Sequence, residues 1–351
     1  MSPEIFVGLI AVLLGLYYQW AFRVLPREEW QFVAVIPGRQ DESGGWTGIN
    51  LTGYGLFTAL AITTATAILL ILLTAVGVSG RSTIYLLLII LSLSVPASRL
   101  TAWLIEGKRH TFSVAGAVFT AGIILPWLIV LWNRLPLTII GEQIPPIRFM
   151  AALVVAYSYG ESLGRLACLS FGCCYGRHVS SLPGRLARLF TPFAVVFHGE
   201  TKKVAYAGRA AGQPLVPVQA LTATFLALNA LAGTWLLRAG YVRTSLFLTL
   251  VLSQLWRFIS EFLRDDYRGT TGKISVYQIF SLTLIIYLFV VARLFNEPTA
   301  LKSDLLDGVL YLWSPLRLVA LAFIFLLSLL YFGLSEVTTS TVVFRVRQDR
   351  I

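Results

Sequence analysis

Long apolar stretches recur along the chain and dominate its pattern. A transmembrane helix needs about 20 mostly apolar residues, and nine segments meet that length. They run approximately over 4–22, 54–77, 83–105, 112–133, 149–170, 217–238, 243–263, 275–295 and 316–334. Backbone polar groups in lipid have to be paired within a helix or a closed barrel, and long continuous apolar runs favour helices. The sequence therefore predicts an all-α polytopic membrane protein, a bundle of about nine transmembrane helices.

Polar segments separate the predicted spans and differ in length. Residues 23–53 are polar, which predicts a loop with a short interfacial helix. The longest loop covers 171–216, and a loop of this length is usually functional or a small subdomain. Alternating apolar positions over 192–197 predict a short strand within it. The polar tail 335–351 predicts a juxtamembrane strand or a disordered end.

The composition agrees with this pattern and excludes other classes of protein. Hydrophobic residues make up 57% of the chain and charged residues only 13%, against roughly 25% charged in soluble domains. A soluble domain, a disordered chain and a disulfide scaffold are therefore excluded. The net charge of +11 comes from basic residues in loops and at helix ends, without a dense basic tract. This favours anionic phospholipid as a partner, and we expect no nucleic acid.

Several charged residues lie inside the predicted spans or at their ends, where lipid penalises them. They are Arg99, Glu161, Arg165, Arg257, Glu261 and Arg264. Glu161 and Arg165 are four residues apart and share one helix face, and Arg257 and Glu261 show the same spacing. Each pair alone fits a salt bridge that pins helices together. The whole set favours a function, because arginine's planar fork binds phosphate through two hydrogen bonds.

The three cysteines of the chain fall in one short segment that follows a predicted span, Gly164–His178. Cys168, Cys173 and Cys174 together with His178 have the spacing C-x4-C-C-x3-H, which matches no common zinc pattern, so we assign no metal. Three other interpretations stay open. The cysteines fit a disulfide on an oxidising face, a thiolate stabilised by nearby arginines, or small buried hydrophobic residues.

Six short segments, in order, resemble motifs of the prolipoprotein diacylglyceryl transferases. The segments are Tyr54–Phe57, Ala97–Leu100, Gly164–Arg177, Pro217–Gln219, Arg257–Arg264, and Gln278 followed by Ser281. The resemblance covers about 48–296, which holds seven of the nine spans and includes the loop 171–216. We therefore divide the chain into an extra N-terminal span and loop (1–47), a transferase-like membrane core (48–296), and an extra C-terminal span with a polar tail (297–351).

This sequence departs from the family pattern at three places. The family's His-Gly-Gly motif falls near 112–116, where this chain has no histidine. Within the signature, Cys168 stands where the family has asparagine and Cys173 where it has glutamate. His110 and Cys173 are the remaining candidates for a base.

The resemblance implies a reaction and a set of site residues. The diacylglyceryl group of phosphatidylglycerol moves to the thiol of a lipobox cysteine in a prolipoprotein signal peptide, and glycerol phosphate leaves. The implied catalytic residues are Arg165 and Arg257, which hold the phosphate, Tyr54, which positions it, and Glu261, which orients Arg257 or acts as a base. The implied substrate-binding residues are Gly176, Arg177, Gln278, Arg264, Arg99, Gln219, Cys168 and Cys173. No cofactor is implied. Two alternatives are the same scaffold acting on a different acceptor, and a non-catalytic phospholipid-binding membrane protein.

The resemblance also implies a place in the cell, the bacterial plasma membrane, with the active face towards the outside. The basic residues point the other way, because the loop 171–216 alone holds six of them and short inner loops hold few. Long loops are a weaker guide to orientation than short ones, so we follow the family topology.

Overall fold

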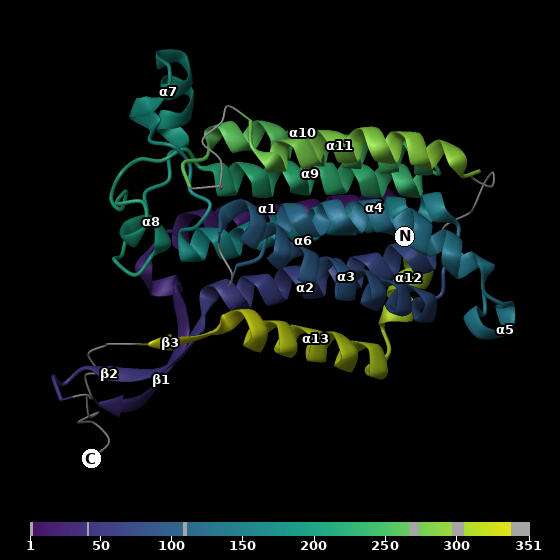
Figure 1. Ribbon diagram of the computed structural model, residues 1–351, viewed down its shortest axis with the longest axis horizontal. Coiled ribbons are helices and arrows are strands. Elements are labelled where there is room, and N and C mark those ends of the chain that lie inside the picture. Colours follow the sequence, from purple (N-terminus) through teal and green to yellow (C-terminus); the bar gives the residue numbers. More distant parts are fainter. Residues whose placement is uncertain (1–2, 41, 108–110, 267–273, 297–304, 338–351) are drawn as a thin grey trace.

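The computed structural model describes residues 3–40, 42–107, 111–266, 274–296 and 305–337. Each predicted span is a helix, and the long helices lie side by side (Figure 1). They are α1 (Pro3–Val24), α2 (Gly53–Ala75), α3 (Gly80–Glu106), α4 (Val114–Arg134), α6 (Pro146–Phe171), α9 (Val218–Arg238), α10 (Val242–Ser260), α11 (Val276–Val291) and α13 (Pro315–Gly333). Shorter helices are α5 (Leu137–Ile140) and α12 (Leu305–Leu312), with 3-10 turns at Glu261–Leu263 and Ala292–Leu294. The predicted all-α membrane bundle is confirmed.

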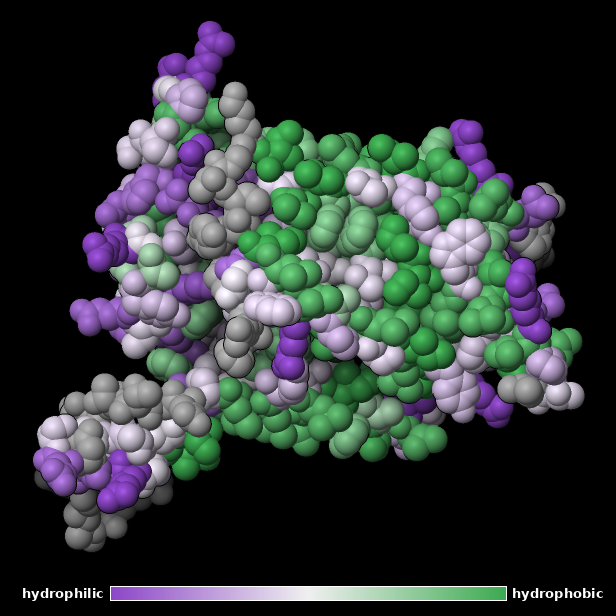
Figure 2. Space-filling view, in the orientation of Figure 1, coloured by the Kyte–Doolittle hydropathy of each residue, from purple (hydrophilic) through white to green (hydrophobic). Residues whose placement is uncertain are grey.

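Helix α6 differs from the other long helices. Among the described residues, eight helices are long and apolar enough to cross a membrane, and α6 is not one of them. It lies at the centre of the bundle, packed against α2, α9 and α10. These neighbours separate its polar residues from lipid, and the face of the bundle seen in Figure 2 is largely apolar over the long helices. The cost of a charge in lipid is thereby avoided, because charged groups in a bundle are tolerated when they face its interior.

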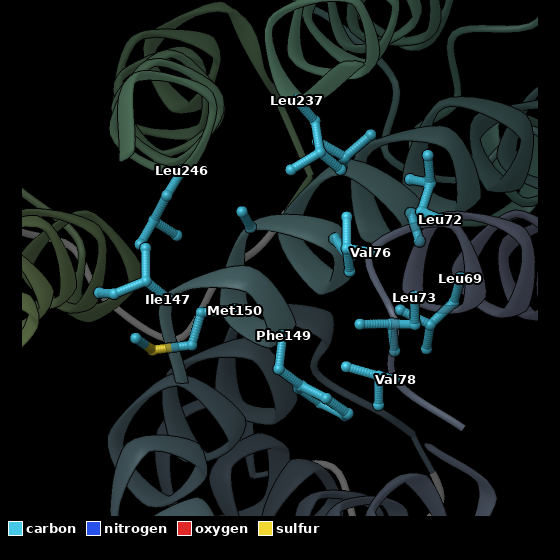
Figure 3. Close-up of a cluster of buried hydrophobic side chains, with 14 of the residues drawn as sticks. Leu69, Leu72, Leu73, Val76, Val78, Ile147, Phe149, Met150, Leu237 and Leu246 are labelled. Atoms are coloured by element: carbon cyan, nitrogen blue, oxygen red, sulfur yellow. The ribbon is translucent and has the colours of Figure 1, made fainter. Parts of the chain in front are cut away.

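The first half of α6 anchors the bundle through apolar packing. Ile147, Phe149 and Met150 are at most 2% exposed and belong to one cluster with Leu72 and Val76 of α2 and its end (Figure 3). Without a hydrophobic driving force between helices in lipid, such close packing supplies much of the association energy.

The C-terminal helix α13 packs on α2 through two glycines. A Cβ placed on Gly55 would lie only 2.1 Å from the Cα of Gly333. Small residues of this kind let two transmembrane backbones approach closely. Other elements cover little of this helix, since only 6% of its apolar stretch is buried.

A small sheet stands where the sequence predicts a loop. Strands β1 (Phe32–Gln40) and β2 (Trp46–Thr52) form an antiparallel hairpin, and β3 (Leu334–Val337) pairs antiparallel with β2. The predicted interfacial helix is a single 3-10 turn at Glu28–Trp30. The tail prediction of a strand is confirmed for β3, and 338–351 lie outside the described residues. The hairpin was missed because β1 is exposed along its whole length and so shows no alternation of buried and exposed positions.

The loop 171–216 folds against the same end of the bundle as the sheet (Figure 1). It contains α7 (Gly184–Phe190), α8 (Lys203–Tyr206) and 3-10 turns at Val179–Ser181 and Thr191–Phe193. The predicted strand over 192–197 is wrong, because the chain forms one isolated bridge there, between Val195 and Leu215. The fully buried Lys202 fastens the loop, since its Nζ donates to the carbonyl of Ser170 (2.6 Å) and to that of Leu25 (3.3 Å).

Candidate functional site

A cavity of about 450 Å³ opens at the loop-bearing end of the bundle. Residues from α2, α3, α4, α6, α10, α11 and α13 line it. Its polar and charged lining residues include Thr52, Tyr54, Glu106, Arg165, Cys168, Cys173, Cys174, Arg257, Glu261, Arg264, Asp266, Tyr277, Tyr331 and Ser335. Its apolar lining residues include Phe112, Val114, Ala115, Phe171 and Phe332. Such a mixture suits a ligand with a charged head and an apolar body.

Two arginines share one carboxylate beside this cavity. Glu161 Oε1 accepts a hydrogen bond from Arg165 and another from Arg257 Nη2, the latter at 2.8 Å. Its second oxygen accepts from the Tyr157 hydroxyl. The three charged side chains are at most 14% exposed. One negative and two positive charges leave the group with an excess positive charge.

Each of the two guanidiniums also has a hydrogen-bond donor without a partner among the described residues. The Nε atoms of Arg165 and Arg257 are buried without a hydrogen-bond partner among the described residues. A buried donor without a partner is costly, so an anion gains affinity here if the two side chains turn an Nε towards it on binding. A phosphate oxygen has both the charge and the acceptor geometry that arginine favours.

The partner of Arg257 could not be read from spacing along one helix. The sequence paired it with Glu261, four residues on, but α10 ends at Ser260 and Glu261 begins a 3-10 turn. The structure joins Arg257 to Glu161 of α6, ninety-six residues away in the chain.

Arg264 has a different environment from the two arginines above. Its guanidinium forms a two-pronged contact with Asp266, with distances of 2.8 and 2.7 Å, and lies 3.8 Å from a carboxylate oxygen of Glu261. With two carboxylates beside it, Arg264 carries no excess charge toward a ligand.

The three cysteines converge on the wall of the cavity. Their sulfurs all lie within 4.8 Å of one another and are free thiols. The turn after α6 has positive φ at Gly172 (+72°) and at Cys174 (+54°), and the Gln219 amide donates to the Cys173 carbonyl at 2.9 Å. Thiol donors from Cys168 and Cys173 hold the pKa of the Cys174 thiol well below its usual value.

A comparison with protein families matches the prolipoprotein diacylglyceryl transferase model over residues 46–294. The chain belongs to the prolipoprotein diacylglyceryl transferase family. It is 29% identical over 142 residues to phosphatidylglycerol–prolipoprotein diacylglyceryl transferase 2 of Clostridium perfringens. That alignment covers 39% of this chain and 48% of the relative, so the chain spans about half the length of the curated relative it matches. No solved structure matches the chain.

The match places this chain with a family of transferases in lipoprotein biosynthesis. Together with the apolar helices, it makes the chain a multi-pass membrane protein of that family. Helices α1 and α13 lie outside the matched residues. The family match stops at residue 294, yet α13 adds Tyr331 and Phe332 to the cavity wall.

The predicted site residues divide into two groups. Those that line the cavity are Tyr54, Arg165, Cys168, Cys173, Arg257, Glu261 and Arg264. Those that do not are Arg99, Gly176, Arg177, Gln219 and Gln278. His110 lies outside the described residues. Motif order alone therefore selects both the cavity wall and the residues that support it.

The second group serves the architecture of the site. Gln278 closes a capping box with Ser275 at the start of α11 and donates to the Phe258 carbonyl at 3.0 Å. The backbones of Gly176 and Arg264 form an isolated antiparallel β-bridge, and the Arg177 backbone N–H donates to the Leu263 carbonyl at 2.9 Å. These contacts join the cysteine turn to the end of α10.

Arg99 is exposed on α3 and contacts the cavity wall from outside. It donates to the Tyr331 hydroxyl at 2.6 Å, and its guanidinium lies 4.6 Å from the centre of the Phe112 ring. Phe112 occupies the region where the family motif supplies histidine, and among the described lining residues none is a histidine.

Sequence reasoning missed several lining residues for two reasons. Cys174, Tyr277 and Asp266 sit beside predicted residues, so a closer reading of the neighbouring positions would find them. Tyr331 and Ser335 come from a segment outside every family motif, and the sequence holds no signal for them.

Glu106, at the end of α3, accepts a hydrogen bond from the Tyr277 hydroxyl at 2.7 Å.

Proposed function

We propose that this protein transfers the diacylglyceryl group of phosphatidylglycerol to the thiol of a lipobox cysteine in a prolipoprotein. The observation that carries the proposal is the pair Arg165 and Arg257 on the single carboxylate of Glu161, at the wall of the cavity. This arrangement suits a phosphodiester head group, because two guanidiniums with an excess positive charge lie at the cavity wall.

The reaction proposed here gives these arginines a role in the transition state. The acceptor sulfur attacks the glycerol carbon that bears the phosphate, and the carbon–oxygen bond to phosphate breaks. The phosphodiester carries one negative charge, and the departing glycerol phosphate gains a second. Preorganised donors that meet such developing charge are worth several kcal/mol in a site that excludes water.

Other lining residues fit the two substrates. The Tyr54 ring packs edge-on against Phe171, at 5.8 Å between ring centres, and its hydroxyl group is available to orient the head group. Phe112, Val114 and Phe332 offer an apolar wall for the glycerol end of the acyl chains. The proposal includes the bacterial plasma membrane, with the cavity open towards the outside.

The test uses the full chain in nanodiscs with phosphatidylglycerol labelled in its acyl chains and a lipobox peptide. We expect label on the peptide cysteine, release of glycerol phosphate, and no label on a peptide with serine at that position. Lipid binding without turnover would refute the transferase and favour a phospholipid-binding protein. Orientation is tested separately with Arg185→Cys, at an exposed position of α7, and a membrane-impermeant maleimide on intact cells. Protection of this cysteine from the reagent would indicate the opposite orientation in the membrane.

A second candidate is the same donor reaction with a different acceptor. The observation that favours it is the apolar surface of Phe112, Val114 and Ala115 in the region where the family motif has histidine. Release of glycerol phosphate without label on the peptide would support this candidate over the first.

A further inference from the structure

The cysteine turn brings three thiols to one point on the cavity wall. Neighbouring side chains in an extended chain point in opposite directions, so adjacent cysteines rarely meet at a common ligand. Here Cys174 adopts φ +54°, a left-handed conformation uncommon for a residue other than glycine. The result is that Cys173 and Cys174 both approach Cys168, with all three sulfurs within 4.8 Å.

We infer that Cys168, Cys173 and Cys174 hold a zinc ion whose fourth position faces the cavity and takes the acceptor thiol as a thiolate. The binding of zinc is independent of the reaction proposed above, whereas the role of the acceptor thiol rests on it. Catalytic zinc sites use three protein ligands and leave one position open to water or substrate. A thiol that coordinates such a metal loses its proton.

The distances fit this assignment. Zinc–sulfur bonds of about 2.3 Å place the sulfurs of a tetrahedral site about 3.8 Å apart. The observed sulfurs, all within 4.8 Å, have to close by no more than about 1 Å. Soft thiolate ligands favour zinc over magnesium or calcium, which prefer oxygen.

The surrounding charges fit the metal-loaded state. Three thiolates and one divalent ion carry a single net negative charge. Arg165 lines the same cavity, interacts electrostatically with Cys174 and shares Glu161 with Arg257. The excess positive charge of this pair of arginines stabilises an anionic complex. The Gln219 amide, which donates to the Cys173 carbonyl, fixes the turn from α9 as an outer support of the ligands.

The open position on the metal supplies a way to deprotonate the acceptor thiol, which the cavity otherwise lacks. The lining carboxylates Glu261 and Asp266 contact Arg264, and Glu106 accepts a hydrogen bond from Tyr277. Glu161, beside the cavity, is shared by two arginines. In the proposed step the acceptor thiol binds zinc and releases its proton to solvent. Its sulfur then forms a bond to the glycerol carbon as the carbon–phosphate-oxygen bond breaks. The thioether that results is a neutral and weaker ligand, and it leaves the metal.

The first test measures metal on the intact protein. The full chain is purified in detergent with a reductant, exposed to zinc, freed of excess ion and assayed for zinc content. We expect about one zinc ion per chain, and loss of most of it in Cys168→Ser and in Cys174→Ser. His198→Ala is the matched control, because His198 lies in the loop outside the cavity lining, and it should keep its zinc. A wild-type protein that takes up no zinc would overturn the inference, as would a disulfide among the cysteines that forms in its place.

The second test avoids variants that could fold poorly. Wild-type protein is loaded with cobalt, and its sulfur-to-metal charge-transfer absorption is recorded. Absence of this band overturns the site. With the band present, we expect the lipobox peptide to change the spectrum without any lipid added, and a serine version of the peptide to leave it unchanged. An unchanged spectrum with both peptides would overturn the open position.

These readouts separate the two proposals because neither requires turnover. Arg257→Lys should keep zinc and the peptide-dependent cobalt spectrum, since Arg257 belongs to the phosphate-binding pair. A protein that binds zinc and thiol but releases no glycerol phosphate from phosphatidylglycerol would support the metal site and refute the proposed donor.

Discussion

The two halves of α6 are similarly buried but differ in chemistry, apart from the buried Arg148 at the start of the first half. The first half packs Ile147, Phe149 and Met150 into an apolar cluster against its neighbours. The second half carries Glu161 and Arg165, which pair with each other and with α10. The same neighbouring helices exclude lipid from both halves.

The difference shows how a membrane bundle accommodates a polar site. The apolar half fixes the position of the helix through packing, and the charged half then meets partners that are already in place. Buried ion pairs add little net stability, because desolvation offsets most of their attraction. Breaking one is nevertheless expensive, so the charged half should be intolerant of change for a reason unlike that of the apolar half.

The largest effect is expected for Glu161→Gln. It leaves two buried guanidiniums without their shared carboxylate, and removing one partner of a buried pair costs about 3–5 kcal/mol. We expect this loss in denaturant unfolding in detergent, together with loss of transfer. Glu200→Gln, in an exposed part of the loop, should change neither quantity. Equal unfolding free energies for both variants would show that the two arginines do not depend on Glu161.

Arg257→Lys tests the charged half through activity. Lysine keeps the charge but loses the fork that binds phosphate at two points, so glycerol phosphate release should fall roughly 100- to 1000-fold. The rate constant and the apparent affinity for phosphatidylglycerol are measured in nanodiscs. Arg185→Lys is the matched control, because Arg185 is exposed on α7 and does not line the cavity. A larger loss in the control would place the phosphate elsewhere.

Phe149→Ala tests the apolar half. Phe149 is 1% exposed, and its truncation should lower the unfolding free energy by roughly 3 kcal/mol through lost packing. Activity per folded molecule should persist, since the residue is far from the cavity along α6. Phe193→Ala, at a side chain that is 67% exposed, should be nearly neutral. If Phe149→Ala abolished activity without loss of stability, the two halves would not be separable.

Gly55→Ala probes the contact between α2 and α13. The added methyl group meets Gly333 at 2.1 Å, so α13 has to move, at a cost of about 1–3 kcal/mol. Because α13 supplies Tyr331 to the cavity, substrate affinity should weaken as well. Gly8→Ala in α1 meets no atom within 4 Å and serves as the control. Unchanged stability would mean that α13 is held by other contacts.

The smallest effect near neutral pH is expected for Lys202, whose contribution to stability changes only in alkaline solution. Burial lowers the pKa of Lys202 to about 8 from its usual 10.5, while Glu28 nearby opposes the shift. Between these values the unfolded chain holds more protons, so stability should rise with pH by at most about 1.4 kcal/mol per unit. Below about pH 8 both states are charged and this contribution is flat. Lys202→Met should remove this rise in the free energy of unfolding, measured between about pH 8 and 10.5. An unchanged slope would assign the pH dependence to another group.

The sequence predicted the long helices well because lipid imposes their length and composition. Each apolar run became a helix, since no other conformation pairs the backbone inside a single segment. The same physics singled out Glu161, Arg165, Arg257 and Glu261, because charges in such segments are costly without a purpose. The third strand of the sheet was not predictable, because β2 pairs with β3 across 285 residues of chain at Asn50 and Ser335.

The sequence by itself thus determined which segments form the long apolar helices and which charged groups lie among them. Only the tertiary structure decided which of these groups meet. Spacing along a helix indicates neighbours on one face, but the contact of Glu161 with Arg257 depends on how α6 and α10 pack. The convergence of the three sulfurs likewise depends on the left-handed turn at Cys174. The physical reason is that local preferences act over a few residues, whereas a site forms from side chains that packing brings together over long distances in the chain.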